Sequence, residues 1–345
     1  MARNGHAIGP PAARIRRTTP RAGRPALAAL FALALVIAAL VGAGPASAAT
    51  QSTVATNVTA PNGGVMLTGA NGSKHLWIPD HLNGVCRVDA AGLNQNTCAL
   101  FLGTNAVKPG QLSFDPVNNY LYIPDLSAKS QGVFRVKYDP NGDNGNGSLS
   151  LFDRTQIAPN CGLGGNLPWA TALGPDGNLY VSFKKSPSIV RVKDPAGVSI
   201  PCGNVQTMGN ASDGRSAFSL AWVGTRLFEA DNKGLGAISN ATQCAVTVGT
   251  CNAVPFLTGQ ITAPQTIAAD QQNSTLYVGA GTNVYAVQVG ATQGFAVYQS
   301  GFGFVTGLTV DPSPLGAGNL PVVYVGDDPS QGALPGAGRI VSITP

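Results

Sequence analysis

The chain has 345 residues, of which 44% are hydrophobic and only 11% are charged. Six of its 21 Lys and Arg residues lie within the first 24 positions, where no acid occurs, so the rest of the chain carries 15 basic against 16 acidic residues. This balance provides no basic surface that could neutralise phosphates, which excludes nucleic acid as an expected partner. The 44 glycines, together with the lack of helical apolar periodicity after Ala49, predict short strands joined by tight turns.

Residues 1–49 have the three parts of a secretory signal peptide. Arginines dominate the sequence up to Arg24, an uncharged apolar stretch covers Ala26–Ala43, and Ala46-Ser47-Ala48 has the small residues of a cleavage site. We therefore expect a secreted, extracytoplasmic protein with no membrane association once the signal is cleaved. An uncleaved anchor stays open as an alternative, because about 18 apolar residues can just span a bilayer. Arg16-Arg17 leaves the choice between the general and the twin-arginine export route open.

Beyond the signal peptide, residues 50–60 are expected to form a closing strand region, and residues 61–345 contain one motif six times. The motif is an apolar run and a tight turn, followed by Leu or Val, an aromatic residue and, in most copies, Ile or Val. The copies begin at Leu76, Leu121, Leu179, Leu227, Leu276 and Val323. Their spacing of 45 to 58 residues matches one four-stranded propeller blade.

Each unit follows the same order of predicted strands. An innermost strand such as Val65–Thr68 precedes a turn rich in Gly, Pro or Asn, then the aromatic strand and a third strand. Weaker fourth strands follow, among them Cys98–Phe101 and Leu149–Phe152. The aromatic strands are apolar at nearly every position, as expected of sheets that are stacked radially with both faces buried. The last unit stops after its third strand, so a strand near Thr53–Val58 should complete it.

These strands predict an all-β fold: a six-bladed β-propeller of four-stranded antiparallel blades, closed by an N-terminal strand that completes the last blade. Leu167–Val181, with the sequence LPWATALGPDGNLYV, resembles the blade pattern of NHL-repeat and SMP-30/gluconolactonase-like β-propellers. At the level of blades the resemblance covers residues 61–345. It implies the architecture but no single activity, because such propellers include binding proteins, lactonases, lyases and scaffolds.

Six cysteines in a chain expected to be exported predict disulfide bonds. A metal cluster is the alternative, but no Cys-X-X-Cys motif occurs and only two histidines follow the signal peptide. Several complete pairings stay open, and the spacing along the chain favours pairs within one blade. The favoured pairs are Cys86–Cys98, Cys161–Cys202 and Cys244–Cys251.

Polar residues gather where the predicted blades meet the central channel. In a four-stranded blade, the turn after the second strand and the crossover to the next blade open on the same face. They surround the channel mouth, the default ligand site of a propeller. Lys184 and Lys185 form a solvated turn there in the simplest interpretation, and in the alternative they attract an anionic ligand. Ligand contacts are expected from Asp80, Asp125, Lys184, Arg215, Gln265 and Asp327.

Four aspartates occupy equivalent positions at the ends of second strands: Asp80, Asp125, Asp231 and Asp327. As hard oxygen ligands they could hold a calcium ion near the axis. The alternative is that each carboxylate caps the backbone of its own turn, and the repetition favours capping because one metal site needs no copies. The repeated aspartates do not require a cofactor, and Ca²⁺ is the one bound ion that we consider for them. Asp139–Gly147 has oxygen donors at calcium-loop spacing but lacks the glycine and glutamate of such loops, so an extended hairpin turn is predicted there.

Glu229 is the only glutamate of the chain and occupies a register that is Ile or Val in the other five units. A carboxyl group buried there would have a raised pKa, a property of many general acids and bases. The alternatives are an ion pair with Arg226 or Arg215 and hydrogen bonds to a nearby backbone turn. If the protein is an enzyme, we expect Glu229 and Asp231 to act as acid–base residues and His81, at the predicted channel mouth, to assist.

The candidate site residues differ from those of the enzymes in the family that the chain resembles. Lactonases of the SMP-30 type typically hold a divalent cation with a glutamate near the first blade, where this chain has Pro61–Met66 and no glutamate. Lyase-like propellers rely on a histidine at the mouth, a role that His81 could take. Whether the protein is an enzyme therefore stays open. One hypothesis is an exported propeller that binds a small molecule or a protein partner at the channel mouth without catalysis. The other is a lactonase-like hydrolase or lyase acting there, and a purely architectural envelope protein is a third.

Overall fold

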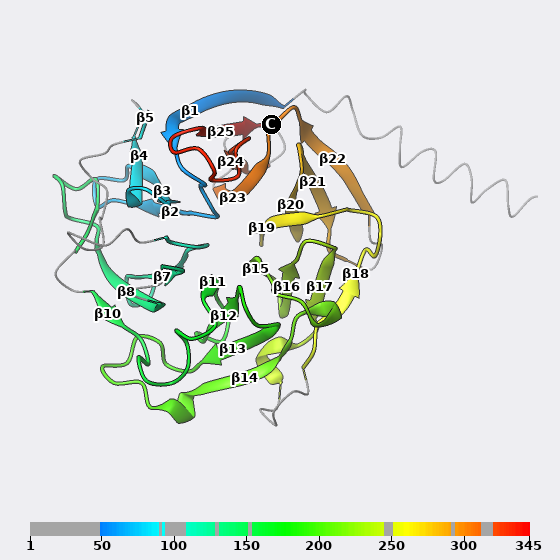
Figure 1. The fold of residues 1–345 in the computed structure, drawn as a ribbon. Coiled ribbons are helices and arrows are strands. Elements are labelled where there is room, and N and C mark those ends of the chain that lie inside the picture. The colour runs from blue at the N-terminus through cyan, green and yellow to red at the C-terminus, as the bar shows by residue number, and fades with distance from the viewer. Residues whose placement is uncertain are drawn as a thin grey trace, which may run out of the picture. The chain divides into compact units, whose positions relative to one another are not determined.

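The computed structural model describes residues 49–89, 92–93, 108–127, 131–150, 154–244, 251–290, 294–311 and 320–345. Residues 1–48 of the predicted signal peptide lie outside them. Within the described residues, six antiparallel sheets follow one another around a common centre (Figure 1). Their helical elements are the short 3-10 turns η3 (Cys202–Asn204), η4 (Ser212–Gly214) and η5 (Ala241–Gln243). The prediction of an all-β, six-bladed propeller is confirmed.

Each blade turns its innermost strand toward the centre and pairs it with its second strand (Figure 1). The innermost strands are β2 (Val65–Thr68), β6 (Ser113–Asp115), β11 (Pro168–Leu173), β15 (Ser219–Val223), β19 (Pro264–Asp270) and β23 (Val305–Asp311). The second strands are β3 (Lys74–Asp80), β7 (Tyr120–Asp125), β12 (Leu179–Phe183), β16 (Arg226–Ala230), β20 (Thr275–Ala280) and β24 (Val322–Asp327). The repeated aromatic motif lies in the second strands, as predicted.

The third strands pair with the second strands and carry the outer strands of the blades. The third strands are β4 (Gly84–Asp89), β8 (Gly132–Asp139), β13 (Ser188–Val192), β17 (Leu235–Ile238), β21 (Asn283–Gln288) and β25 (Gly338–Thr344). The outer strands are β5 (Gly92–Leu93), β9 (Ser148–Leu149) with β10 (Thr155–Gln156), β14 (Val205–Asn210), β18 (Val254–Phe256), β22 (Gly294–Ser300) and β1 (Thr50–Val58).

The outer strands of blades 1 and 2 are the least regular. The predicted strand Cys98–Phe101 of blade 1 lies outside the described residues. The outer strand that the structure describes there is β5, which precedes Cys98 in the chain and pairs with β4. In blade 2, β9 ends at Leu149 and both β9 and β10 pair with β8. Two short segments therefore share the outer position of that blade.

The N-terminal strand β1 completes the last blade, as predicted. It pairs antiparallel with β25 from Thr50, opposite Thr344, to Val58, opposite Gly338. Just after β1, the backbone N–H of Ala60 donates to the carboxylate of Asp328 at 3.0 Å. β1 therefore covers the edge of β25 and becomes the outer strand of the last blade.

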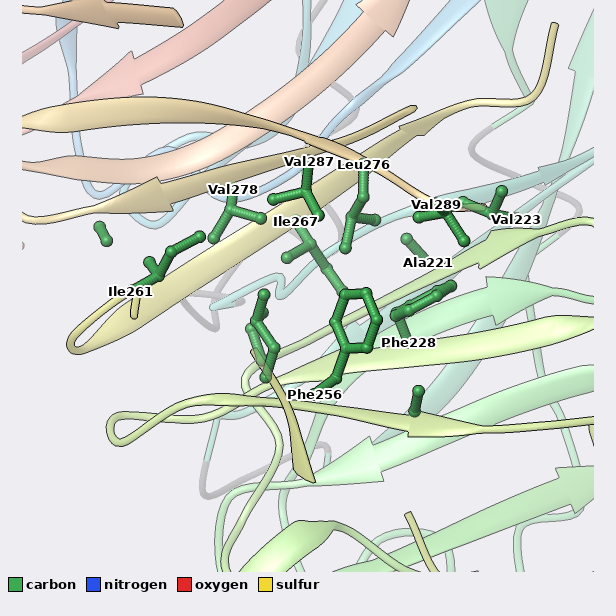
Figure 2. Packing of buried hydrophobic residues seen from close by; sticks show 14 residues of the cluster. Ala221, Val223, Phe228, Phe256, Ile261, Ile267, Leu276, Val278, Val287 and Val289 are labelled. Atoms are coloured by element: carbon green, nitrogen blue, oxygen red, sulfur yellow. The ribbon is translucent and has the colours of Figure 1, made fainter. Parts of the chain in front are cut away.

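The core lies between neighbouring blades, where second strands are buried on both faces. Between blades 4 and 5, Phe228 of β16 meets Phe256 of β18 with ring centroids 5.1 Å apart, and both lie in one cluster with Ile267, Leu276 and Val278 (Figure 2). Burial removes these side chains from water at a gain of about 25 cal/mol per Å² of apolar surface. Such two-sided burial explains why the second strands show apolar runs and no polar alternation.

Two of the three predicted disulfides are confirmed. Cys161 pairs with Cys202 and Cys244 pairs with Cys251, with Cα atoms 5.0 and 6.1 Å apart. The third predicted pair, Cys86–Cys98, involves a residue outside the described part of the chain. Disulfides are typical of oxidising compartments, so the two bonds fit an extracytoplasmic protein. In the part of the chain that the structure describes, no helix has the length and apolar character to cross a membrane.

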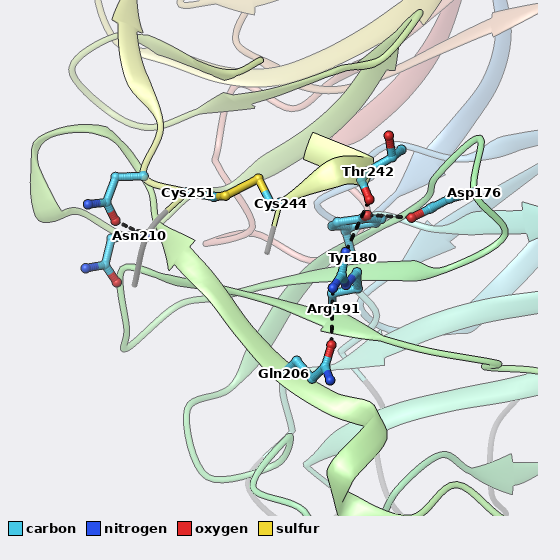
Figure 3. The surroundings of a disulfide bond; sticks show 9 residues. Asp176, Tyr180, Arg191, Gln206, Asn210, Thr242, Cys244 and Cys251 are labelled. Atoms are coloured by element: carbon cyan, nitrogen blue, oxygen red, sulfur yellow. Dashed lines mark hydrogen bonds between the residues drawn. A yellow bond between two sulfur atoms is a disulfide. The ribbon is translucent and has the colours of Figure 1, made fainter. Parts of the chain in front are cut away.

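The Cys244–Cys251 bond lies where blade 4 meets the outer strand of blade 3 (Figure 3). The backbone N–H of Cys251 donates to the carbonyl of Met208 in β14 at 3.3 Å. Nearby, Arg191 of β13 donates to Gln206 of its own blade and to the carbonyl of Thr242 in η5. The disulfide therefore stabilises a contact between two neighbouring blades.

Candidate functional site

A cavity of about 450 Å³ lies at one end of the ring, where innermost strands begin and second strands end. This is the end at which the sequence predicts a ligand site. All six blades or the crossovers before them contribute side chains. We call the space the mouth cavity; its lining consists of Ala60, Asn62, His81, Lys108, Leu126, Leu167, Trp169, Lys184, Phe218, Gln265, Phe304, Thr306, Gln331 and Gly332.

The structure brings together some of the expected site residues and separates others. His81, Lys184 and Gln265 line the mouth cavity, although they come from three different blades. The remaining candidates lie outside this lining: Asp80, Asp125, Arg215, Glu229, Asp231 and Asp327. The cavity therefore differs in chemistry from the expected site, because the described residues that line it include basic but no acidic side chains.

The lining residues that were not expected from the sequence include one lysine and three large aromatic residues: Lys108, Trp169, Phe218 and Phe304. Trp169 is the second residue of β11, whereas Phe218 and Phe304 directly precede β15 and β23. A comparison of the starting positions of innermost strands across the six units would have identified these aromatic residues. Lys108 lies in a crossover that has no repeated pattern, so the sequence carries no signal for it.

The four equivalent aspartates are buried, and their oxygens accept hydrogen bonds from backbone turns. Asp80 Oδ1 accepts from the N–H groups of Leu82 and Asn83 at 2.7 and 2.9 Å. Asp125 accepts in the same way from Ser127, and Asp231 from Lys233 and Gly234. Asp327 differs, because it accepts from the backbone of Gly303 and Phe304 in the crossover before β23 and forms an ion pair with Arg339. Three of the four carboxylates thus cap the turns that follow their own strands, whereas Asp327 does not. Among the described residues, no group of three or more His, Cys, Asp and Glu side chains is placed to hold a metal ion.

The segment Asp139–Gly147 forms consecutive turns between β8 and β9. Within this segment, the carboxylate of Asp143 lies 2.7 Å from the guanidinium of Arg87. The same guanidinium donates a hydrogen bond to the carbonyl of Gly147 at 3.0 Å. An arginine side chain of blade 1 thus provides the positive charge at this loop.

His81 is held at the wall of the mouth cavity by polar neighbours. Its Nε2 lies 3.3 Å from the amide nitrogen of Asn62, a distance at which the amide donates to an unprotonated ring nitrogen. Burial lowers the pKa of His81, and the positive charges of Lys108 and, more weakly, Lys184 lower it further. Contacts with the Pro109 carbonyl and with Asp80 raise this pKa, but by less than the other effects lower it. The imidazole is therefore neutral at pH 7 and able to accept a proton.

An aromatic wall lies on the side of blades 3 and 4. The rings of Trp169 and Phe218 have centroids 5.1 Å apart and are tilted by 41°. The ammonium group of Lys184 lies 4.6 Å from the centroid of the Trp169 ring, a cation–π contact. Ser216 donates to the carbonyl of Lys184 at 2.7 Å, which ties the crossover before blade 4 to the end of β12.

Gln111 joins two innermost segments on different blades. Its side-chain amide donates to the carbonyl of Leu220 at 2.6 Å, and its oxygen accepts from Ser219 and from the backbone of Leu220. These bonds join blade 2 to blade 4, which are not neighbours in the ring. Gln111 also lines a second cavity of about 320 Å³ formed by the innermost strands. It therefore belongs to the lining of the second cavity and not to that of the mouth cavity.

Glu229 is fully buried between blades and does not open into the mouth cavity. Its Oε1 accepts from the backbone N–H and the hydroxyl of Ser212 in η4, at 2.9 and 2.6 Å. The arginines considered as partners have other contacts: Arg226 stacks on Phe228, and Arg215 donates to a nearby asparagine side chain. Of the alternatives considered from the sequence, hydrogen bonding to a backbone turn is the one observed.

Burial raises the pKa of Glu229 to about 7, although the two bonds from Ser212 act in the opposite direction. The charges of Asp231 and Asp213 raise it further. Its second oxygen, Oε2, has no hydrogen-bond partner among the described residues. The carboxyl group is therefore largely protonated below neutral pH.

No protein-family profile matches the chain, and no curated protein sequence matches it. Solved structures do share its fold. A PQQ-bound aldose sugar dehydrogenase from Streptomyces coelicolor has a TM-score of 0.56 and 17% identity, over 87% of this chain and 99% of the dehydrogenase. A gluconolactonase from Xanthomonas campestris has a TM-score of 0.56 and 13% identity, over 86% of this chain and 90% of the lactonase. The chain has the fold of gluconolactonase-like and related six-bladed propellers.

A third structure extends the comparison to a protein of carbohydrate-active enzyme family AA12 from Trichoderma reesei. Its TM-score is 0.58 and its identity 13%, over 87% of this chain and 96% of that one. At these identities the likeness shows a shared architecture, and activity has to be argued from the site.

Proposed function

We propose that this protein is an exported propeller that binds a small molecule in its mouth cavity. The observation that carries the proposal is the cavity itself. Its volume of about 450 Å³ falls within the range of about 300–1,000 Å³ that is usual for small-molecule sites. Its lining combines aromatic and aliphatic side chains with a few converging polar groups, which is the usual composition of such sites.

A small molecule suits this surface better than a protein partner. Protein interfaces are usually broad, whereas the aromatic and polar groups here converge on one concave space. The disulfides and the features of residues 1–49 support an extracytoplasmic location. Detection of the protein in the culture supernatant or periplasm, with a new N-terminus near Ala48 or Ala49, tests that location.

Ligand screening by NMR on the folded protein tests the binding site. The panel includes PQQ and an aldonolactone, because the structural neighbours include a PQQ-bound dehydrogenase and a gluconolactonase. Compounds that bind should lose affinity in Phe218→Ala, which removes half of the aromatic pair. The matched control is Phe295→Ala on outer strand β22, where the ring is 38% exposed and away from the cavity lining. Ligands that bind both variants equally well would contradict a site in the mouth cavity.

Catalysis of the hydrolase or lyase kind is the second candidate function, and His81 is the observation that favours it. A neutral imidazole in a ligand cavity can act as a general base. Glu229 and Asp231 lie outside the cavity lining, so the acid–base role falls to His81 alone. For any ligand that is also turned over, His81→Asn should lower kcat by a factor of about 100 or more while binding persists. Unchanged turnover in this variant would exclude the role.

A further inference from the structure

Among the described residues, the ionisable side chains that line the mouth cavity are all basic: His81, Lys108 and Lys184. Both lysines are exposed, and within the described residues neither is part of an ion pair. Both line the same cavity as His81, and both lower the pKa of this histidine through their positive charge. Two charges from different blades thus act on the same part of the cavity.

The nearest carboxylates do not compete for these lysines. Asp80 and Asp125 are buried behind the cavity wall, with exposed fractions of 0% and 1%. Asp80 accepts three backbone N–H bonds, including one from Thr59, and Asp125 accepts from the backbone of Lys108 and Ser127. Neither carboxylate is among the residues that line the mouth cavity, whereas Lys108 and Lys184 both line it.

The aromatic wall adjoins this basic region directly. Lys184 lies over the ring of Trp169, and Phe218 lies against the same ring. A flat apolar group can stack on Phe218 and Trp169 while a charged substituent stays close to Lys184. The cavity therefore offers a surface for a planar group next to a site for negative charge.

We infer that the ligand of the mouth cavity is an organic anion, a carboxylate attached to a planar apolar group. The carboxylate interacts with Lys108 and Lys184, and the planar group stacks on Trp169 and Phe218. This inference rests on the proposed function, because it names the chemical class of the ligand bound at that same site. It accounts for the combination of basic and aromatic side chains in a chain whose charge balance after the signal peptide is slightly negative.

Calorimetric titration with two matched probes tests the inference. The probes are 2-naphthoate and its neutral analogue 2-naphthamide, which share size and planarity but differ in charge. We expect naphthoate to bind at least about fivefold more tightly, since each lysine contributes as a partly solvated ion pair. Added salt should weaken the binding of naphthoate and leave that of the amide unchanged.

Variants then assign the charge effect to the cavity. Lys108→Met and Lys184→Met should each weaken naphthoate binding about threefold, and the double variant about tenfold. The amide should bind all of them alike. The matched control is Lys185→Met, because Lys185 is an exposed neighbour of Lys184 that does not line the cavity. Methionine keeps most of the side-chain length, so a loss of affinity reports the missing charge.

The possible outcomes separate this inference from the proposed function. Equal binding of the two probes, or an equal loss in the Lys185 control, would overturn the inference. If Trp169→Ala still abolished binding of both probes in that case, the mouth cavity would remain the small-molecule site. Failure of both probes to bind at millimolar concentration would overturn the inference about the ligand class. The NMR panel would then show independently whether the mouth cavity binds a small molecule. Inorganic phosphate binding as tightly as naphthoate would also contradict it, because the aromatic wall would then play no part.

Discussion

Glu229 shows how one residue can break the repeat without disturbing the strand. In β16 it lies at a register that is Ile or Val in the other blades, and its carboxyl group needs room and donors there. Gly236 on neighbouring β17 provides the room, since a Cβ at that position would overlap with Glu229 Oε1. Ser212 provides two donors. The chain thus accommodates a buried carboxyl group, at the cost of a pKa raised to about 7.

This pKa predicts a pH-dependent contribution to stability. The carboxyl group of Glu229 titrates near 4.5 when unperturbed and near 7 in the folded protein, so the folded state retains the proton over that interval. The stabilisation of the folded state by this bound proton is complete below pH 4.5 and is lost as the pH rises through 7. The loss amounts to roughly 3 kcal/mol of unfolding free energy. Glu229→Gln should remove this part of the pH dependence, as measured by urea unfolding at pH 4.5, 6 and 8.

A second variant tests the direction of the effect. Ser212→Ala removes a hydroxyl donor that lowers the pKa of Glu229, so it should shift the loss of stability to higher pH and make it larger. Other titrating groups are common to all three proteins and cancel in the comparison. The same pH dependence in wild type and Glu229→Gln would show that this carboxyl group does not titrate as described.

At the scale of structural elements, disulfides restrain two segments of very different length. Cys161 and Cys202 are 41 residues apart, whereas Cys244 and Cys251 are 7 apart. A cross-link restricts the unfolded chain more when it closes a longer loop, and the chain-entropy relation gives about 4 kcal/mol for the first bond and about 2.5 kcal/mol for the second. The longer link should therefore contribute more to the stability of the ring.

Paired serine variants test this order. Replacing Cys161 and Cys202 by serine should lower the free energy of unfolding by about 1.5 kcal/mol more than replacing Cys244 and Cys251. Urea unfolding of the two double variants in parallel measures the difference, and each serves as the control for the other. Equal losses, or a larger loss for the shorter link, would contradict the entropic account.

The elements also show what the sequence can predict. Second strands repeat an apolar and aromatic run, so their number and spacing identify the blades, and the incomplete last unit predicts the pairing of β1 with β25. Turn-capping by Asp80, Asp125 and Asp231 follows from repetition as well. The position of Lys108 could not be predicted in the same way, because crossovers carry no repeat and the cavity is assembled from separate blades.

At the scale of the whole molecule, the ring places residues from all six blades around one space. His81 of blade 1, Lys184 of blade 3 and Gln265 of blade 5 are far apart in sequence and line the same cavity. Gln111 joins blade 2 to blade 4 through its side-chain hydrogen bonds. The closure by β1 keeps the ring intact, and with it the positions of these side chains.

A crystal structure with 6-bromo-2-naphthoate measures the position of the ligand directly, since bromine scatters anomalously. We expect one anomalous peak in the mouth cavity beside Trp169 and Phe218, with the carboxylate turned toward Lys108 and Lys184. A peak in the second cavity, which the innermost strands form, or on the outer surface of the blades, with the mouth cavity free of ligand, would contradict the account.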